Sequence, residues 1–201
     1  MLIPNIFELY PEYKPQKGIL HIGAHKCEEE PLYYRLGFTN DSILWIDANE
    51  ELIKNKKNYI YAVISDKDNE EVDFMITNNT ESSSILNFKT HLIEHPHVYE
   101  IDRKKVKTIS LNTLYQNFNI NFDKFDFINL DIQGAELKAL QGASNILHYI
   151  RAIYTEVNEK ELYENCCMVD ELDEYLSKYN FKRHHTVMTK HGWGDALYVK
   201  I

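Results

Sequence analysis

Short apolar runs alternate with amphipathic stretches along most of this chain, and this alternation restricts the available folds more than any other feature. Buried strands are predicted at five apolar runs: residues 18–23, 42–47, 59–64, 125–131 and 150–157. Helical patterns are found at residues 28–36, 50–57, 110–117, 135–149 and 169–179. Because strands joined through helices pair in parallel by right-handed crossovers, the sequence predicts an α/β protein with a doubly wound sheet.

The C-terminal part of the chain departs from this alternation. Residues 181–188 and 196–201 read as two strands with no helix between them, so we expect an antiparallel hairpin at the sheet edge. The prediction is then a seven-stranded, mostly parallel sheet with an antiparallel last strand and helices on both faces. This is the pattern of the class I methyltransferase (Rossmann-like) fold.

One long segment shows neither pattern. Residues 71–76 alternate as an edge strand does, but residues 77–105 lack a strong hydrophobic period. This stretch includes His91, His95 and His97, which we expect to be exposed unless one of them acts as a base. Long irregular inserts in compact domains are often functional lids. We therefore expect one domain over residues 1–201, with a substrate-side insert at about 77–105.

Composition and charge exclude several partners. The formal net charge of −9 disfavours nucleic acid, which needs a broad basic footprint. No apolar run approaches the roughly 20 residues of a membrane span, so we expect no membrane partner. The N-terminal residues lack a basic region followed by an apolar stretch, which predicts a cytoplasmic protein. Three cysteines without a CxxC pair fit a reducing compartment.

Polar residues gather where three predicted strands end, at residues 21–25 (HIGAH), 45–49 (WIDAN) and 129–136 (NLDIQGAE). In an open α/β sheet the ligand lies beyond the carboxyl ends of the strands. Gly23 allows a tight turn and a close approach to a ligand, with amides of the following helix free for a carboxylate. Asp47 could accept both ribose hydroxyls of an adenosine, or cap the next helix.

Asp131 in the third group suits an amino group of a cofactor or a role as general base, the alternative being a helix cap. The full GxGxxG pattern is absent from this chain, which disfavours a nicotinamide or flavin cofactor.

Together these motifs resemble the FkbM family of methyltransferases, in the branch whose first motif reads HxGAH. The matching stretches are ILHIGAH (19–25), WIDAN (45–49), AVISDKD (62–68), ESSSIL (81–86), FDFINLDIQGAE (125–136), IYTEVN (153–158) and WGDALYVK (193–200). They occur in order over nearly the whole chain. The resemblance implies the class I fold, S-adenosylmethionine as methyl donor and, usually, O-methylation.

The resemblance also implies roles for individual residues. The predicted cofactor-binding residues are His21, Gly23, Ala24, Asp47, Ala48, Asn49, Ile64, Ser65 and Asp131. The wider family commonly has Asp where this chain has His21. For the acceptor we expect contacts from Ser83, Ser84, Gln133, Glu156 and Asn158. Asp131 or His25 would take the acceptor's proton.

The sequence contains two candidate metal sites. Glu156 and Asn158 end a predicted strand beside Asp131, and Asp195 lies near the last strand. The three acidic groups could hold Mg²⁺ or Ca²⁺, but their spacing is nonlocal. His21, His25 and Cys27 lack the second Cys/His pair that a zinc site needs. The sequence therefore favours S-adenosylmethionine as cofactor without a metal.

The predicted function is methylation of a small hydroxylated acceptor such as a sugar, a glycan or a nucleotide sugar. Two alternatives stay open at this point. An RNA cap-type methyltransferase would need a Lys-Asp-Lys-Glu constellation, which we cannot place, and a basic groove. A non-catalytic protein could retain the fold and the cofactor pocket as a binding module.

Overall fold

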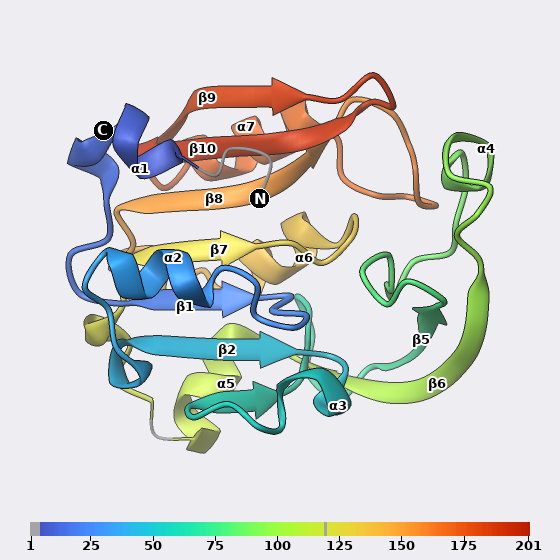
Figure 1. Ribbon diagram of the computed structural model, residues 1–201, viewed down its shortest axis with the longest axis horizontal. Coiled ribbons are helices and arrows are strands. Elements are labelled where there is room, and N and C mark those ends of the chain that lie inside the picture. Colours follow the sequence, from blue (N-terminus) through green and yellow to red (C-terminus); the bar gives the residue numbers. More distant parts are fainter. Residues whose placement is uncertain (1–4, 119) are drawn as a thin grey trace.

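A seven-stranded sheet forms the centre of the molecule in the computed structural model, which describes residues 5–118 and 120–201 (Figure 1). Its strands are β1 (Ile19–Ile22), β2 (Ile43–Asp47), β3 (Tyr59–Tyr61), β7 (Phe127–Leu130), β8 (Ala152–Asn158), β9 (Phe181–Met188) and β10 (Trp193–Lys200). Their order is β3-β2-β1-β7-β8-β10-β9, and β10 runs antiparallel to both of its neighbours. The predicted class I methyltransferase fold is confirmed.

Helices cover both faces of this sheet. The α-helices are α1 (Ile6–Leu9), α2 (Glu30–Arg35), α3 (Glu50–Ile53), α5 (Leu111–Phe118), α6 (Glu136–Gln141) and α7 (Val169–Ser177), with short 3₁₀ turns η1 (Pro11–Tyr13), η2 (Asn40–Ser42) and η3 (Phe122–Lys124). One hydrophobic cluster joins α1, α2 and α3 to the sheet, and the other joins α5, α6 and α7 to its opposite face. Two layers of helices therefore bury the sheet between them.

Strand β1 shows why its apolar run is continuous. Successive side chains of a strand point to opposite faces, and both faces of this sheet are covered. Leu20 and Ile22 belong to the cluster with α5, α6 and α7, whereas Ile19 belongs to the cluster with α1, α2 and α3. All four residues of β1 are buried.

A second sheet of three strands stands beyond the carboxyl ends of β1, β2 and β7 (right side of Figure 1). It consists of β4 (Val63–Ile64), β5 (Glu71–Thr77) and β6 (Glu100–Ile109), in the order β4-β6-β5. The predicted strand 59–64 is therefore divided, because Val63 and Ile64 leave the large sheet to pair with β6.

The expectation of an irregular segment over residues 77–105 is wrong at its end, where β6 begins at Glu100. The first six residues of β6 are exposed and mostly polar or charged, so they show no alternation. Pairing with β5 is what makes them a strand. The segment between β5 and β6 contains the short helix α4 (His91–Glu94).

The predicted helix 135–149 is also too long, because α6 ends at Gln141. A Cβ on Gly142 would lie 2.1 Å from the carbonyl oxygen of Ser65. The Gly142 carbonyl accepts a hydrogen bond from the amide of Asn112, at the start of α5, instead of continuing a helix. A tertiary contact thus ends this helix. No helix within the described residues is long and apolar enough to cross a membrane.

Candidate active site

The loop after β1 and the end of β2 are joined tightly. The amides of Gly23 and Ala24 both donate to the carbonyl oxygen of Ile46, at 2.9 and 3.1 Å. The Asp47 carboxylate accepts from the amides of His25 and Asn49, each at 2.7 Å. Helix α2 begins only at Glu30. The end of β2 therefore uses the amides of residues 23–25, and the helix whose amides we expect to be free begins further along the chain.

Gly23 is required where β1 meets the strand beside it. Its φ of +79° lies in the left-handed region, and a Cβ there would be 1.7 Å from the carbonyl oxygen of Asp131. The loop after β1 and the loop after β7 consequently touch backbone to backbone.

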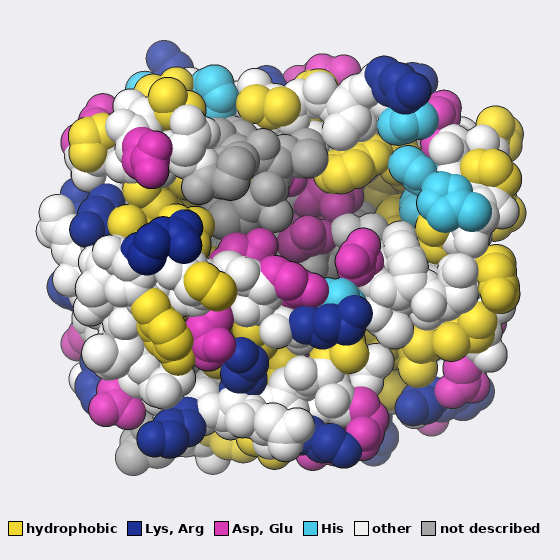
Figure 2. Space-filling view, viewed as in Figure 1, with side chains coloured by type: hydrophobic (Ala, Val, Ile, Leu, Met, Phe, Trp, Pro, Cys, Tyr) yellow, Lys and Arg dark blue, Asp and Glu magenta, His cyan; other side chains and the backbone are white. Residues whose placement is uncertain are grey.

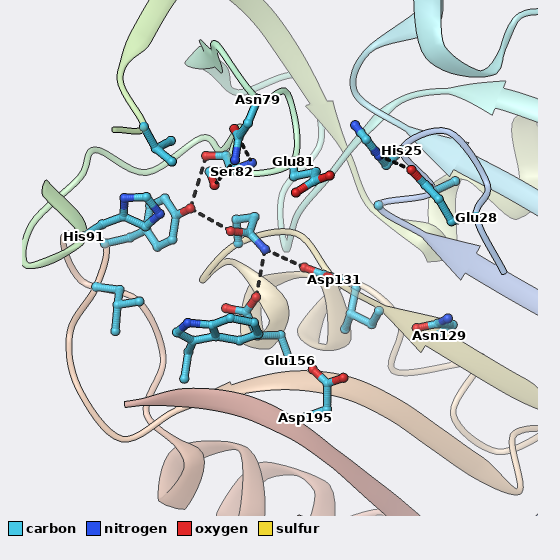
Figure 3. Close-up of a pocket in the computed structure, with 18 of the residues that line it drawn as sticks. His25, Glu28, Asn79, Glu81, Ser82, His91, Asn129, Asp131, Glu156 and Asp195 are labelled. Atoms are coloured by element: carbon cyan, nitrogen blue, oxygen red, sulfur yellow. Dashed lines mark hydrogen bonds and ion pairs between the residues drawn. The ribbon is translucent and has the colours of Figure 1, made fainter. Parts of the chain in front are cut away.

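Two adjoining cavities open at these strand ends. The larger has a volume of about 470 Å³, and the narrower, beside β2, about 70 Å³. Both are lined by Gly23, His25, Glu81, Asp131 and Gln133, so they meet at these residues. Acidic side chains are visible inside the hollow on this face, and histidines lie on its right-hand rim (Figure 2). Figure 3 shows the larger cavity in detail.

The narrower cavity combines a carboxylate with apolar walls. It is lined by four residues predicted to bind the cofactor, Asp47, Ala48, Asn49 and Ile64, together with Phe74. Such a combination suits an adenosine, whose ribose hydroxyls donate to a carboxylate and whose base packs on apolar side chains.

Ser65 is the predicted cofactor residue that does not line either cavity. It is buried, and its hydroxyl donates to the carboxylate of the neighbouring Asp66 at 3.0 Å.

A single amide links two carboxylates in the larger cavity. The Gln133 side-chain nitrogen donates to Asp131 at 2.7 Å and to Glu156 at 2.8 Å (Figure 3). The Tyr163 hydroxyl donates to the Gln133 side-chain oxygen at 2.7 Å, which fixes the direction in which the amide faces. Asp195, opposite Glu156 on β10, accepts a hydrogen bond from the Tyr154 hydroxyl.

The carboxyl groups of Asp131, Glu136 and Glu156 hold protons more strongly than usual. Asp131 is accessible from the cavity but recessed in the protein, and burial together with the Asp195 carboxylate raises its pKa to about 6. Burial also raises the pKa of Glu136 to about 7. For Glu156, burial and the carboxylates of Asp131 and Glu136 raise the pKa well above its ordinary value. Like charges this close disfavour one another's ionisation, so a cation bound here would be stabilised.

His21 occupies the position where the wider family commonly has Asp. The Asn129 amide donates to the Tyr33 hydroxyl at 2.8 Å, so that hydroxyl donates its own proton to His21 Nδ1 at 3.0 Å. Burial lowers the pKa of His21 to about 4. A neutral ring that accepts at Nδ1 carries its proton on Nε2, which lies 3.9 Å from the Glu29 carboxylate; both residues line the larger cavity.

His25, the other predicted catalytic residue, has both ring nitrogens engaged. Nδ1 lies 2.9 Å from the Glu28 carboxylate, and Nε2 lies 2.7 Å from the Thr80 hydroxyl. That hydroxyl donates to the Asn79 carbonyl and therefore accepts from Nε2. His25 lines both cavities, but neither nitrogen is left to take a proton from an acceptor.

The residues predicted to bind the acceptor are divided between different places. Gln133 and Glu156 line the larger cavity, whereas Ser83 and Ser84 line the narrower one. The Ser84 hydroxyl donates to the Gln133 carbonyl at 2.8 Å, which ties the loop before α4 to the loop after β7. Asn158 is fully buried at the end of β8 and donates to Glu156 at 3.3 Å.

The three insert histidines line the larger cavity. The expectation that they are exposed is wrong for His91, which is buried. Its ring stacks on Phe88 at a centroid distance of 4.3 Å and contacts Tyr163 at 5.3 Å. Aromatic packing on both sides explains the burial.

The candidate metal ligands do not form a metal centre in the structure. Within residues 5–118 and 120–201, no group of three His, Cys, Asp or Glu side chains is arranged to hold a metal ion. Cys27 is buried, and this burial raises the pKa of its thiol to about 12.

Sequence reasoning missed several residues of the cavity, notably Tyr163, Trp193 and Glu81. Tyr163 lies in a loop and is one of 14 tyrosines in the chain, so no local pattern distinguishes it. Its contacts with residues far away in the sequence, such as Gln133 and His91, show its place in the site.

A comparison with family models identifies the family of this chain. The sequence model described as the methyltransferase FkbM domain matches residues 21–183, more than half of the chain. No curated protein matches the chain in sequence.

Two solved structures resemble it. Magnesium protoporphyrin IX methyltransferase from Synechocystis PCC 6803, with bound S-adenosylmethionine, is 9% identical to this chain and has a TM-score of 0.43. The match covers 96% of this chain and 74% of that protein chain. The 1,6-didemethyltoxoflavin-N1-methyltransferase of Burkholderia thailandensis, with bound 1,6-didemethyltoxoflavin and S-adenosylhomocysteine, is 10% identical to this chain and has a TM-score of 0.46. The match covers 99% of this chain and 76% of that protein chain. Identities this low say nothing about a shared acceptor.

Proposed function

This chain belongs to the FkbM methyltransferase family and uses S-adenosylmethionine, and from that premise we propose that it methylates a hydroxyl group of a small, sugar-like acceptor. The narrower cavity would hold the adenosine part of the cofactor and the larger cavity the acceptor. The observation that carries the proposal is the position of Asp131, which lines both cavities where they meet.

The residues present fit this cofactor. Gly23 lines both cavities without a side chain, and Asp47 keeps carboxylate lone pairs for ribose hydroxyls. The recessed carboxyl groups around Asp131 suit the positive charges of the sulfonium and the amino group. When bound, S-adenosylmethionine supplies a methyl group that an acceptor oxygen can attack in line.

The first prediction concerns the ribose contact. Asp47→Ala removes both acceptor oxygens and should weaken S-adenosylhomocysteine binding by about 3 kcal/mol, or about 150-fold, since each of two hydrogen bonds to a charged group contributes about 1.5 kcal/mol. Calorimetric titration measures this loss. Asp41→Ala, which removes an exposed carboxylate in η2, is the matched control. Equal affinity in the two variants, with both folded, would contradict the assignment of Asp47.

A hydroxyl acceptor fits the groups of the larger cavity. Carboxylates and amides hydrogen-bond to hydroxyls, and the aromatic side chains of Tyr154, Tyr163 and Trp193 give the apolar surface on which a sugar ring can pack. A carboxylate whose pKa is about 6 is suited to take a hydroxyl proton near neutral pH. The acidic lining argues against an RNA backbone as acceptor.

The experiment that tests the function is a panel of acceptors with methyl-labelled S-adenosylmethionine. Monosaccharides, nucleotide sugars, amines and thiols are offered at one concentration, and the product is identified by NMR. We expect an O-methyl product, formed roughly tenfold faster or more from hydroxylated acceptors than from amines. Methylation at nitrogen or sulfur alone would overturn the proposal. If no acceptor reacts although the cofactor binds, the chain is a binding module.

A further inference from the structure

Four histidines from two distant segments meet at the end of the larger cavity away from the cofactor loops. His91 and His95 lie on and just after α4, at a ring-centroid distance of 4.9 Å, and His97 follows at 6.1 Å from His95. His191, from the loop between β9 and β10, contacts His95 at 4.7 Å. His91 stands on the opposite side of the cavity from His25 and Glu28 (Figure 3).

One of these histidines has an unused hydrogen-bonding atom. His91 is 4% exposed, and its Nδ1 has no hydrogen-bond partner among the described residues. Buried polar atoms are nearly always paired, by protein, water or ligand. His91 lines the cavity beside His95 and His97, so the cavity is where a ligand would meet this ring.

Among the described residues, the carboxylate that contacts this histidine cluster is already engaged by other side chains. Glu94 is the nearby carboxylate, and it lies 2.7 Å from His191 and 3.8 Å from Lys160. Tyr163 packs against His91 with a hydroxyl that donates to Gln133. Burial and the neighbouring imidazoles lower the pKa of His91 to about 4 and also lower that of His95. An anion among these rings would reverse that effect and favour their protonation.

From this arrangement we propose that His91, His95 and His97 form a binding site for a phosphoryl group carried by the acceptor. Three imidazoles on one wall offer several N–H donors, and a phosphoryl group has several acceptor oxygens to receive them. The opposite end of the cavity is lined by Asp131 and Asp195, whose ionised carboxylates repel an anion. The acceptor would therefore bind in one direction, with its phosphoryl group at the histidines and its hydroxyls toward Asp131.

The acceptor class named here, a phosphorylated sugar-like molecule, rests on the proposed function. The anion site itself does not, because its geometry is independent of methyl transfer. The two can therefore be tested separately on one sample.

The probe is inorganic phosphate, added to protein labelled with ¹³C in its histidine rings and followed by NMR. We expect saturable shifts of the His91, His95 and His97 signals, and a rise in the pKa of His91 and His95 when phosphate is present. His95→Gln should weaken phosphate binding by about tenfold. His148→Gln, which changes an exposed histidine outside both cavities, is the matched control and should bind phosphate as the parent does.

Each other outcome is decisive. Shifts that do not saturate, that are equal for acetate, or that persist in both His95→Gln and His97→Gln would overturn the phosphoryl site. S-adenosylhomocysteine binding, measured on the same samples, shows that each variant is folded. If that ligand fails to bind the parent protein while phosphate binds, the proposed function fails and the anion site stands.

Discussion

Replacing Gly23 with alanine should destabilise the folded protein by about 4 kcal/mol or more, because the new methyl group has no space and the backbone is strained. The Cβ would stand 1.7 Å from the Asp131 carbonyl oxygen, and neither backbone segment can move freely. The amides of Gly23 and Ala24 are hydrogen-bonded to the Ile46 carbonyl. The Asp131 amide is hydrogen-bonded to the Ile22 carbonyl at 3.0 Å. Urea unfolding measures the loss.

Gly37→Ala is the matched control for this substitution. Gly37 also has a positive φ, +92°, but nothing lies within 4 Å of where its Cβ would be. The Gly37→Ala substitution should therefore lower the free energy of unfolding by about 1 to 2 kcal/mol only, because alanine disfavours the left-handed backbone conformation. Equal losses of stability in the two variants would show that the loops after β1 and β7 can separate, and that Gly23 is not required by their contact.

Asp131→Asn should lower the rate of methyl transfer by about 1,000-fold while S-adenosylhomocysteine still binds, because the amide cannot accept the acceptor's proton. Asparagine keeps the shape of the side chain, and its oxygen can still accept from Gln133. In the parent enzyme, the pH dependence of methyl transfer should also show that the reaction needs the ionised Asp131 carboxylate. The base acts when ionised, so kcat/KM should fall about tenfold for each pH unit below about 6 and level off above it.

Single-turnover kinetics on the acceptor found by the panel measure both effects. Glu81→Gln is the matched control, since Glu81, like Asp131, is an exposed carboxylate that lines both cavities. This substitution should lower the rate of methyl transfer by less than about tenfold, because the Glu81 side chain contributes charge but does not take the proton. A loss of similar size in Asp131→Asn and Glu81→Gln would mean that the cavity needs negative charge in general, and that Asp131 is not the base.

The sequence by itself determined the α/β architecture, since that depends on patterns within single elements. Continuous apolar runs mark strands buried on both faces, as in β1. The missing helix between β9 and β10 marks the antiparallel edge. Gly23, Asp47 and Asp131 could be assigned to the site because each directly follows or ends a strand, and parallel strands end at one edge of the sheet.

Only the tertiary structure decided how the site is assembled. Strand β6 exists because β4 and β5 pair with it, and its own exposed, charged residues give no period. His91 is buried because Phe88 and Tyr163 enclose it, although its local sequence is polar. Gln133 joins Asp131 to Glu156, 23 residues further on, through one amide. Contacts between residues so far apart leave no local pattern in the sequence, and the fold alone brings them together.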